Sequence, residues 1–235
     1  MLTPAHTNRS LIPTLKRLIV TMSLTISTAL LASCGGTDSS TAGLDVSEAG
    51  QLAYACGLTD HVESEHGAPD SWDDFIGEDA DPAVRETAAI GALAMGSDDE
   101  TFNDAGEMLV DGVSRADFEG VSSGLEHMGK DCGSVEDVEK ADVSHEAQLD
   151  YACSLAEHIG EEHGEASTWL DDDDFVVVSE AMGAAALTGA MNGQTLADHQ
   201  ELSEAGRDLL SGVTGADADY TDEFLESFQS ACAEL

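Results

Sequence analysis

The chain has 235 residues, and its 48 acidic and eight basic side chains give a formal net charge of −40. A charge this large and one-sided excludes nucleic acid as a partner, because phosphates would be repelled. It also keeps the body of the protein off an anionic membrane surface. Two explanations of the acidity stay open: hydrated carboxylates that keep an exported protein soluble in high salt, or a surface that binds cations.

The chain opens with a basic segment followed by an apolar one. Basic residues at positions 9, 16 and 17 precede an apolar run over residues 18–31, which ends in Leu31-Ala32-Ser33-Cys34. This order of segments resembles a bacterial lipoprotein signal peptide. The resemblance implies that the chain is cut before Cys34 and that lipid is attached to the sulfur of this residue.

Residues 1–33 would then be the signal peptide, and residues 34–44 a lipidated, flexible tether. The mature protein would keep five basic side chains and a net charge of −43. No later stretch is long and apolar enough to span a bilayer. We therefore expect a protein held at the extracytoplasmic side of the cell membrane by its covalent lipid.

Most of the remaining chain is a tandem duplication. Asp45–Trp72 aligns with Asp142–Trp169 at an offset of 97 residues, and 14 of these 28 positions are identical. After the tryptophan the second copy carries three extra residues, so Ala105-Gly106 and Cys132 return 100 residues later. Two copies of this length are typical of a duplicated small domain. We assign residues 45–140 to the first repeat and residues 141–235 to the second.

Each repeat is predicted to be helical throughout. Apolar residues recur at helical spacing, and the first helix of each repeat begins after a serine, Ser47 or Ser144, and ends at a glycine, Gly67 or Gly164. Pro82 opens a second helix that runs to about residue 96, a third covers residues 101–113, and the fourth ends near Cys132. Only residues 175–178 are β-like, and that run is short. We therefore predict an all-α fold of two tandem homologous four-helix units.

Four cysteines follow Cys34, two in each repeat. Three pairings are arithmetically open. The duplication selects Cys56–Cys132 and Cys153–Cys232, each of which joins the first helix of a repeat to its last. Closing a loop of that length stabilises a domain by about 4 kcal/mol in the chain-entropy model. A thiolate metal or redox site is the alternative, but no closely spaced cysteine pair favours it.

Repeated histidines and glutamates are the candidate metal ligands. His61 and Glu65 share one helical face, and His158 and Glu162 repeat that pair, which suits zinc or another first-row divalent ion. The second histidine of each repeat, His66 or His163, lies five residues past the first, about 140° round an α-helix. One α-helix cannot bring both to one metal, so further ligands such as His127, His199 or the acidic loops would be needed. The alternative is a capping role, since histidine in a last helical turn complements the helix dipole.

The remaining motifs point to no catalytic chemistry. Gly120–Gly124 matches a hydrolase nucleophile pattern, but it lies within a predicted helix rather than at a strand-to-helix turn. The acidic run at residues 171–174 could hold calcium only weakly, because its spacing is not that of a calcium-binding loop.

We therefore expect no enzymatic activity and no cofactor other than a divalent metal. The first hypothesis is a non-catalytic binding module at the cell envelope, whose partner is an unidentified envelope protein or small ligand. The second hypothesis is a lipoprotein that captures divalent metal through the repeated His/Glu pairs, and an enzyme of unknown class is a weaker third.

Overall fold

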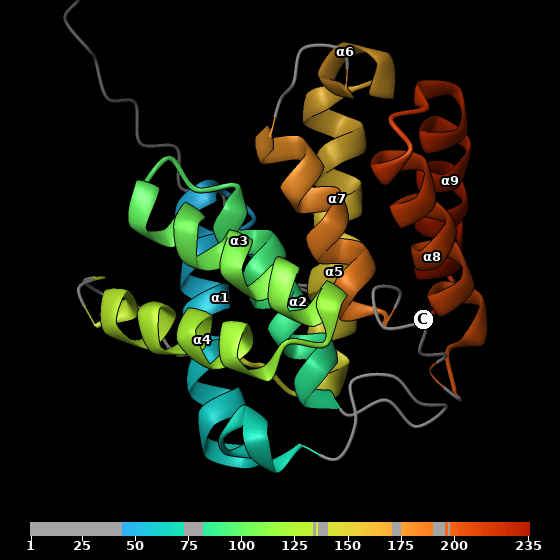
Figure 1. The fold of residues 1–235 in the computed structure, drawn as a ribbon. Helices are drawn as coiled ribbons and strands as arrows, with labels where there is room; N and C mark the ends of the chain where they lie inside the picture. The colour runs from blue at the N-terminus through green and yellow to red at the C-terminus, as the bar shows by residue number, and fades with distance from the viewer. Residues whose placement is uncertain are drawn as a thin grey trace, which may run out of the picture. The chain divides into compact units, whose positions relative to one another are not determined.

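The computed structural model shows a fold in which every regular element of the described part of the chain is helical (Figure 1). The residues described are 44–72, 82–133, 135, 141–170, 175–189, 196 and 198–235. The prediction of an all-α fold is confirmed. The predicted signal peptide and lipid-attachment residue Cys34 lie outside these ranges. The acidic run at residues 171–174 and residues 136–140, at the end of the first repeat, also lie outside them. Within the described ranges, no helix is both long and apolar enough to cross a bilayer.

The first repeat contains the four predicted helices. They are α1 (Glu48–His61), α2 (Pro82–Met95), α3 (Glu100–Arg115) and α4 (Phe118–Cys132). A π-helical turn (Val62–His66) extends α1, and a short 3₁₀ turn (Pro69–Ser71) follows it. The predicted cap is present, because the Ser47 side chain accepts a hydrogen bond from the backbone N–H of Gly50.

The second repeat has the same order with one addition. Its helices are α5 (His145–His158), α6 (Ala166–Leu170), α7 (Phe175–Leu187), α8 (Gln200–Thr214) and α9 (Ala218–Cys232), and a π-helical turn (Ile159–His163) extends α5. Ser144 caps α5 as predicted. The short helix α6 is not expected from the sequence, and it occupies the place of the 3₁₀ turn in the first repeat. The β-like run at residues 175–178 forms the first turn of α7. Its valines are buried or half-buried, because this helix packs in the core.

Both predicted disulfides are present. Cys56 bonds Cys132 and joins α1 to α4, while Cys153 bonds Cys232 and joins α5 to α9. The Cα atoms are 5.6 Å apart in the first bond and 5.7 Å apart in the second, which is the ordinary spacing for a disulfide. Each repeat is therefore closed by one covalent link between its first and last helices.

The two repeats share one hydrophobic core, and helices α2 and α7 lie at its centre. Both helices are rich in alanine and glycine, so their backbones approach closely. A Cβ atom added at Gly183 of α7 would lie 2.7 Å from a methyl group of Leu93 in α2, which is far inside van der Waals contact. The glycine leaves room for the end of the Leu93 side chain between the two central helices.

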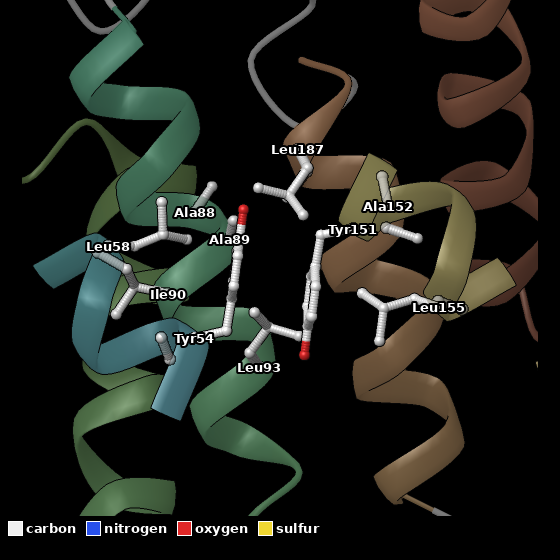
Figure 2. Close-up of a cluster of buried hydrophobic side chains, with 14 of the residues drawn as sticks. Tyr54, Leu58, Ala88, Ala89, Ile90, Leu93, Tyr151, Ala152, Leu155 and Leu187 are labelled. Atoms are coloured by element: carbon white, nitrogen blue, oxygen red, sulfur yellow. The ribbon is translucent and has the colours of Figure 1, made fainter. Parts of the chain in front are cut away.

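Two stacked tyrosines mark the contact between the repeats. The rings of Tyr54 in α1 and Tyr151 in α5 lie 3.7 Å apart and are within 5° of parallel. Figure 2 shows the rings face to face with their hydroxyl groups directed to opposite sides. Since these two residues are equivalent in the duplication, the same side chain from each copy meets at the boundary. The clusters described below lie elsewhere, where α1 and its π turn pack against α2 and where α5 and its π turn pack against α7.

Candidate metal centres

The π-helical turns bring together the two histidines of each repeat. In a π-helix the hydrogen bonds join residues five apart, so side chains at i and i+5 lie above one another. His61 ends α1 and His66 ends the π turn, and their rings are 5.7 Å apart. Gly67 then turns the chain away with a positive φ of 72°. The expectation that one helix cannot bring both histidines together is wrong, because it assumed α-helical geometry throughout.

The first centre consists of His61, His66 and Glu86. Glu86 lies on α2, and its carboxylate faces both rings. Nε2 of His66 is 3.2 Å from Oε2, and Nε2 of His61 is 3.7 Å from Oε1. The glutamate side chain is only 3% exposed, whereas the two imidazoles are 30% and 21% exposed. The centre is closed on the carboxylate side and open to solvent on the histidine side.

The second centre repeats this arrangement with His158, His163 and Glu180. Nε2 of His158 is 3.8 Å from Oε1 of Glu180, and Nε2 of His163 is 3.7 Å from Oε2. The two rings are perpendicular, with centroids 5.3 Å apart. Nε2 of His163 is buried and makes no hydrogen bond within the described residues. The two centres therefore have the same ligand types on equivalent elements.

The spacing of these atoms is close to that of a metal coordination sphere. In each centre the two imidazole nitrogens and a carboxylate oxygen lie within 4.8 Å of one another. Two ligand atoms bound to a tetrahedral zinc ion lie about 3.4 Å apart, given bonds of about 2.1 Å. The separations of 3.7 and 3.8 Å are too long for hydrogen bonds but close to this ligand spacing, whereas His66 and Glu86 are hydrogen-bonded at 3.2 Å.

The predicted partners of the histidines differ from the observed ones. Glu65 and Glu162 lie on the π turns, are exposed, and belong to neither centre. Across each π turn the side chain grouped with the first histidine is the second histidine, five positions later, and not the glutamate four positions later. His127 is exposed on α4, and the ring of His199 lies near that of His145 rather than in a centre. The carboxylate that faces the histidines belongs instead to a central helix, α2 in the first repeat and α7 in the second.

Sequence comparison of the two repeats does not reveal these glutamates. Glu180 follows Glu86 by 94 residues, whereas the histidines repeat after 97 and the third helices after 100. The chain lengths between helices differ in the two copies, so no single offset aligns the three elements. One signal was available: Glu180 is the only charged residue of α7, and Glu86 is the only acidic residue of α2. A carboxylate in an apolar helix needs a buried partner.

The electrostatic surroundings of the two centres differ at the position before the glutamate. Arg85 is buried beside Glu86, with its Nη2 atom 3.7 Å from Oε1, and Ser179 occupies the equivalent position beside Glu180. The Arg85 guanidinium donates to the backbone carbonyl of Leu187, at the end of α7, and faces Nδ1 of His145 at 3.3 Å. Burial lowers the pKa of Arg85, and the carboxylate of Glu86 opposes that change. Burial also lowers the pKa of His145, and the Arg85 charge adds to this effect.

Comparison of the chain with models of known protein families, with curated proteins and with solved structures finds no significant match.

Proposed function

We propose that this protein binds divalent transition-metal ions at two equivalent centres, one in each repeat. The observation that supports this function best is the occurrence of the same three-ligand cluster twice, on equivalent helices, in a position that needs an uncommon π turn both times. A pair of imidazoles and a carboxylate is a ligand set used for zinc and for other first-row divalent ions. Duplication has preserved the histidines and the π turns together.

The open side of each centre favours exchangeable binding over a structural metal. Structural zinc is enclosed by four protein ligands, whereas three protein ligands leave a position for water or another donor. The histidines are partly exposed, so an ion can enter and leave without unfolding of the core. Metal capture or delivery at the cell envelope is therefore the form of this function that we prefer to a general interaction module.

The proposed location follows from the lipoprotein resemblance at Cys34. A lipid on this residue would hold the two centres close to the membrane, outside the cytoplasm. Disulfides persist in such a compartment, and the two that join the first and last helices of the repeats are consistent with it. A protein partner that receives or supplies the metal stays a prediction.

The test is a thermal melt of the chelated full chain, followed by addition of zinc, copper, manganese or calcium singly in high salt. Salt screens diffuse attraction to the acidic surface but not binding at a built site. A metal present at 100 times its dissociation constant stabilises the fold by about 2.7 kcal/mol for each site. We expect a shift of several degrees with zinc and little with calcium.

The matched control compares two pairs of glutamates. Replacing Glu86 and Glu180 with glutamine should abolish the zinc-induced shift, because each centre loses its only carboxylate. Replacing Glu65 and Glu162 with glutamine should leave it intact, because these exposed side chains belong to neither centre. An equal shift with every divalent ion, or equal behaviour of the two variants, would refute the proposal.

The second centre is expected to bind zinc more tightly than the first. A chain with His158→Ala and His163→Ala keeps only the first centre, and one with His61→Ala and His66→Ala keeps only the second. The positive charge of Arg85 is next to the first centre, so it repels a divalent ion there and lowers the affinity by about tenfold. Competition with a zinc-binding dye measures both affinities under the same conditions.

The charge can be tested directly within the first-centre chain. Arg85→Met should raise its zinc affinity toward that of the second centre, whereas Arg115→Met should not change it. Arg115 is an exposed residue that pairs with Asp111 at 3.1 Å, so it controls for the loss of one positive charge from the surface. Equal affinities of the two unmodified centres would contradict this prediction.

A further inference from the structure

Two buried glutamines connect each metal centre to the other repeat. Gln51 lies on α1 and Gln148 lies at the equivalent position on α5, and these residues are 3% and 1% exposed. A buried amide is costly unless it is hydrogen-bonded. The hydrogen-bond acceptors of the two side chains therefore explain why both repeats have a glutamine at this buried position.

The side-chain amide of each glutamine donates two hydrogen bonds, and the acceptors are of the same kind in both repeats. Nε2 of Gln51 donates to the backbone carbonyl of the residue five positions earlier, at 2.8 Å, and to Oε1 of Glu180, at 2.6 Å. Nε2 of Gln148 donates to the carbonyl five positions earlier, also at 2.8 Å, and to Oε1 of Glu86, at 2.8 Å. In both cases the carboxylate belongs to the repeat that does not contain the glutamine.

The orientation of these amides follows from their partners. Both groups that face Nε2 are acceptors, a carbonyl and a carboxylate, so the amide nitrogen rather than its oxygen must point toward them. The first contact anchors the glutamine to the segment that leads into its own helix. The second contact fixes the position of one carboxylate oxygen. The plane of the carboxylate is thereby set, with Oε2 turned toward His66 in the first centre and toward His163 in the second.

We propose that Gln51 is a positioning residue for the second metal centre and Gln148 is one for the first. This inference rests on the proposed metal-binding function. Groups that hydrogen-bond a ligating carboxylate hold it in the geometry that the metal needs, and their loss typically lowers metal affinity about 10- to 100-fold. Here the holding group and the metal ligand come from different repeats.

The consequence is a crossed dependence between the repeats. Helix α1 carries His61 of the first centre and, ten residues earlier, the glutamine that holds the carboxylate of the second. Helix α5 carries His158 of the second centre and the glutamine that holds the carboxylate of the first. Each repeat contains the three ligands of one centre but not the glutamine that holds its carboxylate, so each centre depends on both copies.

The test uses the two single-centre chains defined above, with zinc as the probe. Gln51→Met keeps the length of the side chain and removes its hydrogen bonds. It should lower zinc affinity about 10- to 100-fold in the chain that keeps only the second centre. In the chain that keeps only the first centre the affinity should change less than about threefold, although Gln51 lies in the same repeat as that centre. Gln148→Met should give the opposite pattern.

The crossed pattern separates positioning from a general effect on folding. A loss of packing would weaken both centres alike, and the thermal melts of the metal-free variants measure that contribution. If Gln51→Met prevents folding, Gln51→Asn keeps the amide but is too short to reach Glu180, and the same crossed loss is expected.

Equal losses in both chains, or a loss confined to the centre of the same repeat, would overturn the inference while leaving the proposed function standing. Absence of zinc binding by the single-centre chains before any glutamine is changed would overturn the proposed function, and this inference with it.

Discussion

Replacing His158 and His163 together with alanine is expected to remove one of two bound zinc ions. The carboxylate of Glu180 alone is then left in that centre, and a single carboxylate has little affinity for zinc in competition with water. Loss of a group that only orients a ligand costs about 10- to 100-fold, so loss of two ligands should cost about a thousand-fold or more. Equilibrium dialysis followed by elemental analysis gives the number of bound ions per chain.

A matched variant tests whether histidine content alone determines the result. His127→Ala combined with His199→Ala removes two histidines that lie outside both centres, and this chain should still bind two ions. Equal zinc content in the two double variants would show that the clusters are not the binding sites. The side chains of His158 and His163 are 26% and 27% exposed, so thermal melts of the metal-free variants measure any packing that is lost.

Removing the disulfide between Cys153 and Cys232 is expected to lower the free energy of unfolding by about 4 kcal/mol. The bond closes a loop between residues 79 apart, and the chain-entropy model gives a cost of that size when the unfolded state is released from this constraint. Cys153→Ser with Cys232→Ser avoids reduction of the other bond, and denaturant unfolding monitored by circular dichroism measures the change. Removing Cys56–Cys132, whose residues are 76 apart, should have nearly the same effect.

The number of unfolding transitions tests whether the two repeats unfold together. Since the two repeats share one core and bury stacked tyrosines at their contact, loss of either disulfide should weaken the whole protein. One cooperative transition at lower denaturant is expected. Two separated transitions, with only one repeat destabilised, would contradict the description of a single packed body.

Much of the fold could be predicted from the sequence because the duplication repeats each local signal. Serine caps at Ser47 and Ser144 and glycine ends at Gly67 and Gly164 are local features, and the structure contains all four. The disulfide pairing was determined by symmetry between the copies. These signals depend on a few neighbouring residues, and tertiary packing did not override them.

The ligand set of the centres could be predicted only in part. The sequence identifies the four histidines as candidate ligands but does not predict the π turns that align them. A π turn has no characteristic amino-acid composition that would distinguish it from an α-helical turn. Glu86 and Glu180 were missed because they lie on a different helix and at a different offset in the two copies. The contacts that hold their carboxylates, from Gln51 and Gln148, connect residues 129 and 62 positions apart and depend on how the repeats pack.

The most direct test of the two centres is the location of bound zinc by anomalous X-ray diffraction at the zinc absorption edge, on crystals grown from chelated protein and then soaked in zinc. Two anomalous peaks are predicted, one among His61, His66 and Glu86 and the other among His158, His163 and Glu180. Peaks confined to the acidic surface, or none in either cluster at full zinc loading, would contradict the assignment of these residues as metal centres.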